Sequence, residues 1–345
     1  MLSTIISGRF MTTDMKNRPP MPIRDSGGSF QINNPDDGTP IREMFSLGDG
    51  LLIITDKCTY KIRVADQIDP ERKNSALPHN FQQKLFDHGI TSELLCRTLW
   101  HAKIMFRKEF QTIDVERAKH LSFDALSDIV AMNETAHAFK TAEQAALEKT
   151  KNLERKDLSL TIPSVGNVQA HCKTFFQKAY HFSSSLLQIV RLFYPETKNW
   201  DDLLELVKSK YGEDDYFYKV LQIAVPRLKL VGAARNCLDH HNVKGVITRD
   251  FEPQADGTIA SPTIEINRDG NILDRSSISL LMEHLIMTSL DAFKMITVHM
   301  CGKNVQPFAG LPMTIGILSE EYQKAWHVRF AYGSYYQDGQ FVPCG

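Results

Sequence analysis

Long stretches of the chain carry apolar residues at helical spacing, and this periodicity constrains the fold more than any other feature. The clearest stretch runs from Ser277 to about His299, where Leu281, Leu285 and Phe293 recur among apolar neighbours. Apolar side chains spaced three or four residues apart form one stripe of an α-helix, which must be buried against another element. Long amphipathic helices joined by shortish loops pack as antiparallel bundles. We therefore predict a mainly α-helical protein, built as an antiparallel helical bundle.

Capping signals, glycine and proline separate the helical tracts from one another. Pro226 lies inside one tract and should kink or split it, because proline lacks a backbone donor and clashes with the preceding turn. The predicted tracts are residues 81–110 with a break near Gly89, 114–155, 168–194, 200–211, 215–241 and 277–299. Together they place the bundle at residues 80–303.

Short segments with strand character add small β elements toward both ends. The runs Leu51–Thr55 and Thr59–Val64 have strand character, and apolar residues alternate with polar ones in the second run. They predict a hairpin within an otherwise polar N-terminal segment, residues 1–79. Asp269-Gly270 lies in the middle of Thr263–Leu273 and predicts a second hairpin. Residues 304–345 are expected to form a small C-terminal β element.

Composition and charge exclude several classes of protein. A formal net charge of -1 argues against non-specific nucleic-acid binding over the whole surface. The apolar stretch Leu2–Ile6 is too short for a signal peptide, and no apolar run approaches the length of a membrane span. The six cysteines occur singly, which is typical of reduced thiols. These features predict a cytoplasmic protein with no membrane association.

The densest group of chemically competent side chains is residues 235–241, at the end of a helical tract. Its sequence is Arg-Asn-Cys-Leu-Asp-His-His. Arginine presents a fixed cationic fork that matches a phosphate, and histidine transfers protons near neutral pH. This combination can cleave a phosphodiester without a metal ion. On one helix Arg235 and His240 are about 140° apart, so they would share a site more easily if a second copy faced the first.

The pair Arg235-Asn236, followed by three residues and His240, resembles the R-x4-6-H signature of HEPN domains in its RN-x3-H form. The resemblance covers residues 168–303, about two-fifths of the chain, and does not extend to residues 1–80 or to the C-terminal tail. It implies a helical bundle and a metal-independent endoribonuclease whose site forms across a homodimer, without a cofactor. Arg235 and His240 would then be catalytic and Asn236 would support them, while His241 lies at the outer permitted spacing. Family members also include toxins with antitoxin partners, defence effectors, nucleotide-binding proteins and inactive domains.

A purely structural interpretation competes with this one. Cationic side chains near a helix C-terminus interact favourably with the helix dipole, and Asp239 can pair with Arg235 at i,i+4 spacing. Asp239, His240 and His241 form a poor metal site, since adjacent histidines on a helix point apart, and no metal is expected. The alternative is a non-catalytic helical module that binds a nucleotide or a partner protein. Exposure of Arg235 and His240 in a cleft at a two-fold interface favours the ribonuclease. Pairing of Arg235 with Asp239 and packed histidine rings favour the module.

Overall fold

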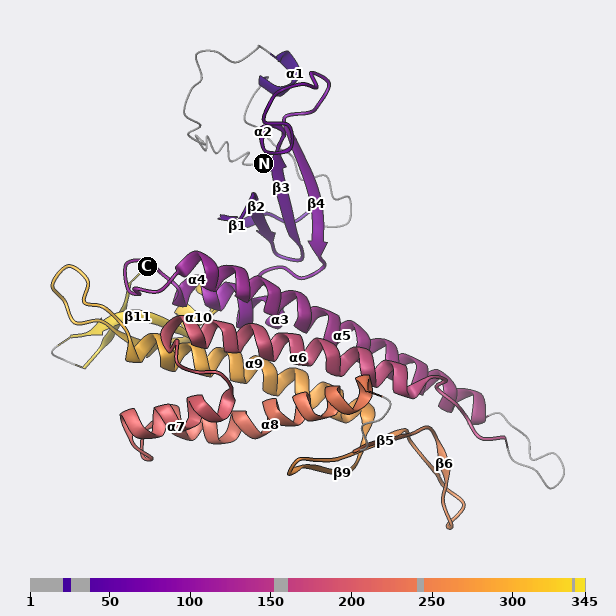
Figure 1. Ribbon diagram of the computed structural model, residues 1–345. Helices are drawn as coiled ribbons and strands as arrows, with labels where there is room; N and C mark the ends of the chain where they lie inside the picture. Colours follow the sequence, from indigo (N-terminus) through magenta and orange to yellow (C-terminus); the bar gives the residue numbers. More distant parts are fainter. Residues whose placement is uncertain (1–20, 26–37, 152–160, 241–244, 337–338, 345) are drawn as a thin grey trace. The chain divides into compact units, whose positions relative to one another are not determined.

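The computed structural model describes residues 21–25, 38–151, 161–240, 245–336 and 339–344 (Figure 1). The chain divides into two compact units, Met1–Cys96 and Arg97–Gly345. Of the described residues, 51% are helical and 21% are in strands or bridges. The predictions for the start of the chain, including Leu2–Ile6, lie outside the described residues, as do His241 and residues 152–155 of one helical tract.

The first unit is built around a four-stranded antiparallel sheet in the order β1-β2-β3-β4. Its strands are β1 (Ile41–Leu47), β2 (Gly50–Thr55), β3 (Thr59–Val64) and β4 (Asn80–Phe86), and its short helices are α1 (Pro22–Asp25), α2 (Ala65–Ile68) and α3 (Glu93–Leu95). Ile53, Tyr60 and Ile62 form its apolar core. The hairpin predicted from Leu51–Thr55 and Thr59–Val64 is confirmed, but it is the centre of a larger sheet.

The second unit contains long helices packed side by side. The π-helix η1 (Cys96–Trp100) leads into it from the first unit. Its helices are α4 (His101–Met105), α5 (Val115–Lys151), α6 (Val168–Phe193), α7 (Trp200–Tyr211), α8 (Tyr216–Asp239), α9 (Ile278–Lys303) and α10 (Glu320–Trp326). Helix α6 packs against α5, α8 and α9 (Figure 1). The rings of Phe182 and Phe293 join α6 to α9, with centroids 6.1 Å apart. Helix α8 continues through Pro226.

Local sequence sets where these helices begin and end. The side chains of Asn167, Asn199 and Ser277 each accept a backbone N–H bond at the first turns of α6, α7 and α9, which satisfies donors that have no partner inside the helix. Gly212 ends α7 with a φ of 90°, a conformation that glycine adopts without strain.

Small antiparallel sheets complete the second unit. One has the order β5-β8-β9, formed by β5 (Val246–Arg249), β8 (Thr263–Arg268) and β9 (Asn271–Ser277). A second pairs β6 (Glu252–Pro253) with β7 (Ile259–Ala260), and a third has the order β10-β11-β12, formed by β10 (Thr314–Ile317), β11 (Phe330–Tyr335) and β12 (Phe341–Pro343). The hairpin predicted at Thr263–Leu273 is confirmed as β8 and β9.

The predicted fold class, a mainly α-helical bundle with small β additions, is wrong. The protein is a mixed α/β structure with substantial antiparallel sheet among its described residues. The interval 81–110 fails most clearly, because Asn80–Phe86 is strand β4, and β5 to β9 lie inside the interval assigned to the bundle. Phe81 and Leu85 have helical spacing, but pairing with β3 makes their segment a strand, and such pairing is not a local property.

His101 joins α4 to α9 inside the second unit and provides a test of this packing. Its ring is 2% exposed and Nε2 lies 2.9 Å from Thr297 Oγ1. Burial, followed by the nearby Lys294 charge, lowers the pKa of His101 to about 3 from 6.5.

We predict that His101 makes folding stability fall as the pH drops from 6.5 toward 3. In this window the unfolded chain binds a proton at His101 and the folded chain does not. The free energy of unfolding therefore falls by about 1.4 kcal/mol for each unit by which the pH is lowered. The variant His101→Gln, which cannot titrate, should lose less stability between pH 6.5 and pH 5. The measurement is urea unfolding at each pH; equal pH dependence in the two proteins would contradict the assignment.

Candidate functional site

The C-terminal end of α8 carries the motif that the sequence singled out. Arg235, Asn236 and Asp239 lie on its last two turns, and His240 caps the helix in an extended conformation, with φ -110° and ψ 107°. The backbone N–H of His240 donates to the carbonyl of Asn236 at 3.3 Å. The motif therefore lies at a helix terminus packed against α6.

Neighbouring side chains hold Arg235 in one orientation. Its guanidinium carbon lies 5.2 Å from the ring centroid of Tyr180 on α6, a cation–π contact. Nη1 donates to Asn236 Oδ1 at 3.1 Å, and Nε lies 2.7 Å from Asp239 Oδ2. Nε is buried and has no hydrogen-bond partner among the described residues, so its contact with Asp239 is an ion pair without hydrogen-bond geometry. The side chain as a whole is 28% exposed.

Asp239 balances two cations. Besides Arg235, it contacts Lys173 on α6, where Lys173 Nζ lies 3.4 Å from Asp239 Oδ1. The i,i+4 pair of Arg235 and Asp239 that the structural interpretation predicted is confirmed. Asp239 thus holds two cationic side chains close together at this end of α8, where the helix dipole also favours cations.

His240 is exposed and lines a pocket of about 400 Å³. The pocket lies between the end of α8, the start of α6 and strands β5 and β8; its lining residues are Gln169, Cys237, Leu238, His240, Gly245, Val246, Ile247, Thr248, Glu265 and Asn267. Arg235 is not among them. The structure thus places Arg235 and His240 at one helix end without bringing them into one cavity, as their angular separation on a helix predicted.

Several of these lining residues have no counterpart in the sequence-based prediction. Gln169, Thr248, Glu265 and Asn267 come from elements far apart in the chain, and none belongs to a recognisable motif. Only the pairing of β5 with β8, and the packing of α6 against both β5 and α8, brings them beside His240. Asn236, predicted to support the site, is exposed and holds Arg235.

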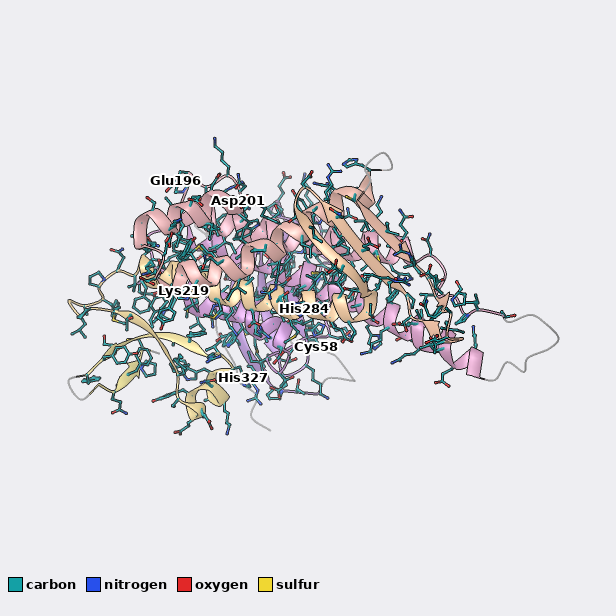
Figure 2. The ribbon with its side chains drawn as sticks, turned by 90° about the horizontal axis from the view of Figure 1, so that it is seen from below. Cys58, Glu196, Asp201, Lys219, His284 and His327 are labelled. Carbon is teal, nitrogen blue, oxygen red and sulfur yellow. The ribbon has the colours of Figure 1, made fainter. Side chains whose placement is uncertain are left out.

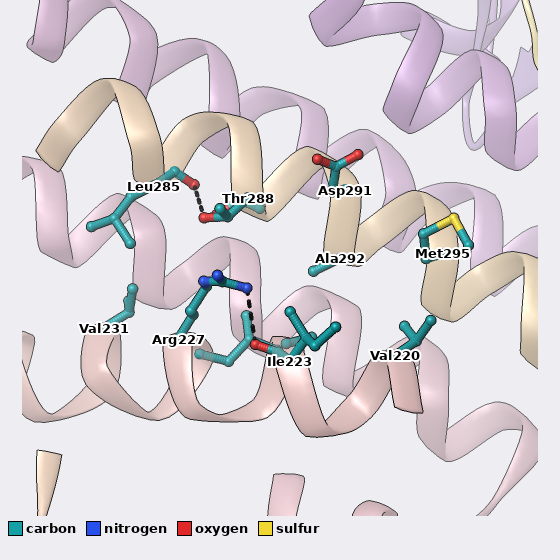
Figure 3. A pocket seen from close by; sticks show the side chains of 12 residues that line it. Val220, Ile223, Arg227, Val231, Leu285, Thr288, Asp291, Ala292 and Met295 are labelled. Carbon is teal, nitrogen blue, oxygen red and sulfur yellow. Dashed lines mark hydrogen bonds between the residues drawn. The ribbon is translucent and has the colours of Figure 1, made fainter. Parts of the chain in front are cut away.

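A second cavity lies between α8 and α9, with a volume of about 310 Å³ (Figure 3). Its walls are mostly apolar, and its cationic side chain, Arg227, donates from Nη1 to the carbonyl of Ile223 at 3.1 Å. None of the motif residues lines it. This cavity is therefore separate from the candidate site at the end of α8.

For the other residues that could have carried chemistry, the relevant properties are metal binding, exposure and burial. Within the described ranges, no three or more His, Cys, Asp and Glu side chains are grouped as a metal site would require. His284, for which the apolar neighbours of α9 would predict a core position, is exposed on α9 (Figure 2). Cys172 is buried, which raises the pKa of its thiol to about 12. No helix in the described part of the chain has the length and apolar character that crossing a bilayer requires.

Comparisons with protein-family models, with curated proteins and with solved structures found no match for this chain. The candidate site is therefore defined by its own geometry and by the motif in its sequence.

We predict that Asp239→Asn increases the affinity for a short single-stranded RNA, because it removes the carboxylate that balances Arg235 and Lys173. The affinity should also depend more steeply on salt, with a slope larger by about 0.7 for each additional phosphate contact. Stability should change by no more than about 1 kcal/mol, since the ion pair is partly exposed.

Fluorescence anisotropy of a labelled oligonucleotide at several salt concentrations measures both quantities. Asp201→Asn is the matched control. Asp201, which lies on α7 (Figure 2), also pairs with a lysine, since its Oδ2 lies 2.8 Å from Lys229 Nζ. An equal gain of affinity in both variants would show that net charge alone is responsible.

Proposed function

We propose that this chain is a metal-independent endoribonuclease of HEPN type that acts as a homodimer, with Arg235 and His240 acting on the scissile phosphate. The observation that carries the proposal is the end of α8 itself. There, Tyr180, Asn236 and Asp239 fix a partly exposed arginine, and the next turn carries an exposed histidine. A fixed cationic fork and an accessible proton-transfer group are what phosphodiester cleavage needs when no metal takes part.

The chemistry follows from these two groups. His240 accepts the proton of the ribose 2′-hydroxyl, and the 2′-oxygen attacks the phosphorus. The bond from the phosphorus to the 5′-oxygen of the next nucleotide breaks, and this oxygen takes up a proton from water. The products are a 2′,3′-cyclic phosphate and a 5′-hydroxyl. Arg235 offsets the charge that develops on the non-bridging oxygens. DNA lacks the attacking hydroxyl and should be inert.

Two copies are part of the proposal because of how α8 presents these groups. Arg235 faces Tyr180 on α6, whereas His240 faces the pocket beside β5. A second copy that faced the first could place its arginine beside the histidine of its partner, so each site would use both chains. Asn236, Asp239 and His241 are proposed as supporting residues of this composite site.

A non-catalytic module that binds a nucleotide or a partner protein is the second candidate. Two observations favour it: Arg235 already pairs with Asp239, and Arg235 does not line the pocket of His240. Under either candidate function the protein would be cytoplasmic, in keeping with six cysteines that are all free thiols. A toxin or defence role, with an antitoxin or another partner protein, belongs to the ribonuclease proposal.

We predict that the wild-type protein cleaves single-stranded RNA in the presence of a chelator. His240→Ala should lower the rate by about 10²- to 10⁴-fold, the usual contribution of acid–base catalysis. Arg235→Ala should cause a comparable loss, and Arg235→Lys should restore little, because an ammonium group does not reproduce the planar fork. The measurement is the cleavage of a labelled RNA pool, with circular dichroism to confirm folding.

His284→Ala and Arg117→Ala are matched controls, because both residues are exposed and lie outside the pocket. Both should cleave like the wild type. Undiminished cleavage by the double variant of Arg235 and His240 would reject this site. If the wild-type protein binds RNA but cleaves none of the RNAs tested, the result would favour the binding module.

A further inference from the structure

The pocket beside His240 lies against the sheet formed by β5, β8 and β9. Its lining includes Ile247 on β5 and Glu265 on β8, which are paired across the two strands, so their side chains lie on the same face of the sheet. Asn267 lies two residues beyond Glu265 on β8 and shares that face. The end of α8 and the start of α6 form the rest of the wall.

Polar side chains from α6 and β8 contribute hydrogen-bonding groups to this pocket. The side-chain amides of Gln169 and Asn267 are exposed and make no hydrogen bond within the described residues. Glu265 contributes a carboxylate, whose Oε2 lies 3.4 Å from Arg249 Nη1, while Oε1 has no hydrogen bond within the same described ranges. The apolar part of the wall includes Leu238, which is 5% exposed. The lining therefore combines amide donors and acceptors, one acceptor-only carboxylate and an apolar surface.

We propose that this pocket binds a single unpaired nucleobase of the RNA strand, beside the phosphate on which His240 acts. This inference rests on the proposed ribonuclease function and adds a base preference to it. The volume of about 400 Å³ is in the range of small-ligand pockets and accommodates one base rather than a duplex. Amide and carboxylate groups read the hydrogen-bonding edges of bases that have been separated from their neighbours.

The carboxylate of Glu265 makes the preference specific. A carboxylate accepts hydrogen bonds and donates none, so it favours an exocyclic amino group over uracil, whose one imino donor N3–H lies between two carbonyl oxygens that repel the carboxylate. Adenine, cytosine and guanine carry such a group, and uracil does not. Cleavage should accordingly occur next to one or more of the amino-bearing bases and be slow next to uridine.

The test uses nucleoside 3′-monophosphates, which contain no bond for the protein to cleave. Isothermal titration of the full chain should show saturable binding of at least one amino-bearing nucleotide, about tenfold or more tighter than uridine 3′-monophosphate. Asn267→Ala and Gln169→Ala should each weaken this binding by about tenfold. Glu265→Gln should reduce the difference in affinity between the amino-bearing nucleotides and uridine 3′-monophosphate, because an amide can also donate a hydrogen bond to uracil. Gln177→Ala is the matched control, since Gln177 is exposed on α6, the helix that carries Gln169, but lies outside the pocket.

Failure of this inference differs from failure of the proposed function. Absence of saturable binding, or equal binding of all four nucleotides that the variants leave unchanged, overturns the base pocket. RNA cleavage whose base preference is unaltered in Glu265→Gln and Asn267→Ala also overturns it. Base-selective nucleotide binding without any RNA cleavage supports the pocket and overturns the ribonuclease.

Discussion

The burial of α6 between its neighbours is the constraint on which the candidate site depends. Phe175, Phe176 and Phe182 are all at most 1% exposed, and helix α6 packs against α5, α8 and α9. Removing such a ring from a core costs about 3–5 kcal/mol, so the burial of α6 in the core is strongly determined. The packing of α8 against α6 brings Tyr180 and Lys173 of α6 to Arg235 and Asp239 of α8. Packing of the core thus sets the electrostatics at the end of α8.

The negative charge of Asp239 at this helix end has two opposite effects. Asp239 orients Arg235 and lowers the repulsion between Arg235 and Lys173, which stabilises the folded chain modestly. Asp239 also opposes the binding of a phosphate at the same place, because its negative charge competes for both cations. An anionic ligand must therefore offset this competition, and a second copy that supplies another cation would make this easier.

Local sequence patterns predicted the long helices α5 to α9 and the two hairpins, but they missed strand β4 and helix α10. Helix α6 spans Val168–Phe193 where residues 168–194 were predicted, since periodicity and capping are local properties. Strand β4 was missed because its state depends on pairing with β3, which no local pattern encodes. Likewise the motif at Arg235 and His240 was visible in the sequence, whereas Gln169 and Asn267, which lie 98 positions apart, are neighbours only through the tertiary fold.

The composite site across two copies is the central claim, and mixing two inactive variants tests it most directly. In a dimer of one Arg235→Ala chain and one His240→Ala chain, one of the two sites would hold an intact arginine and an intact histidine. Random exchange makes about half of the dimers mixed, so the mixture should recover up to about a quarter of the wild-type cleavage rate. A mixture as inactive as either variant alone, under conditions in which subunits exchange and the wild type cleaves, would contradict the claim.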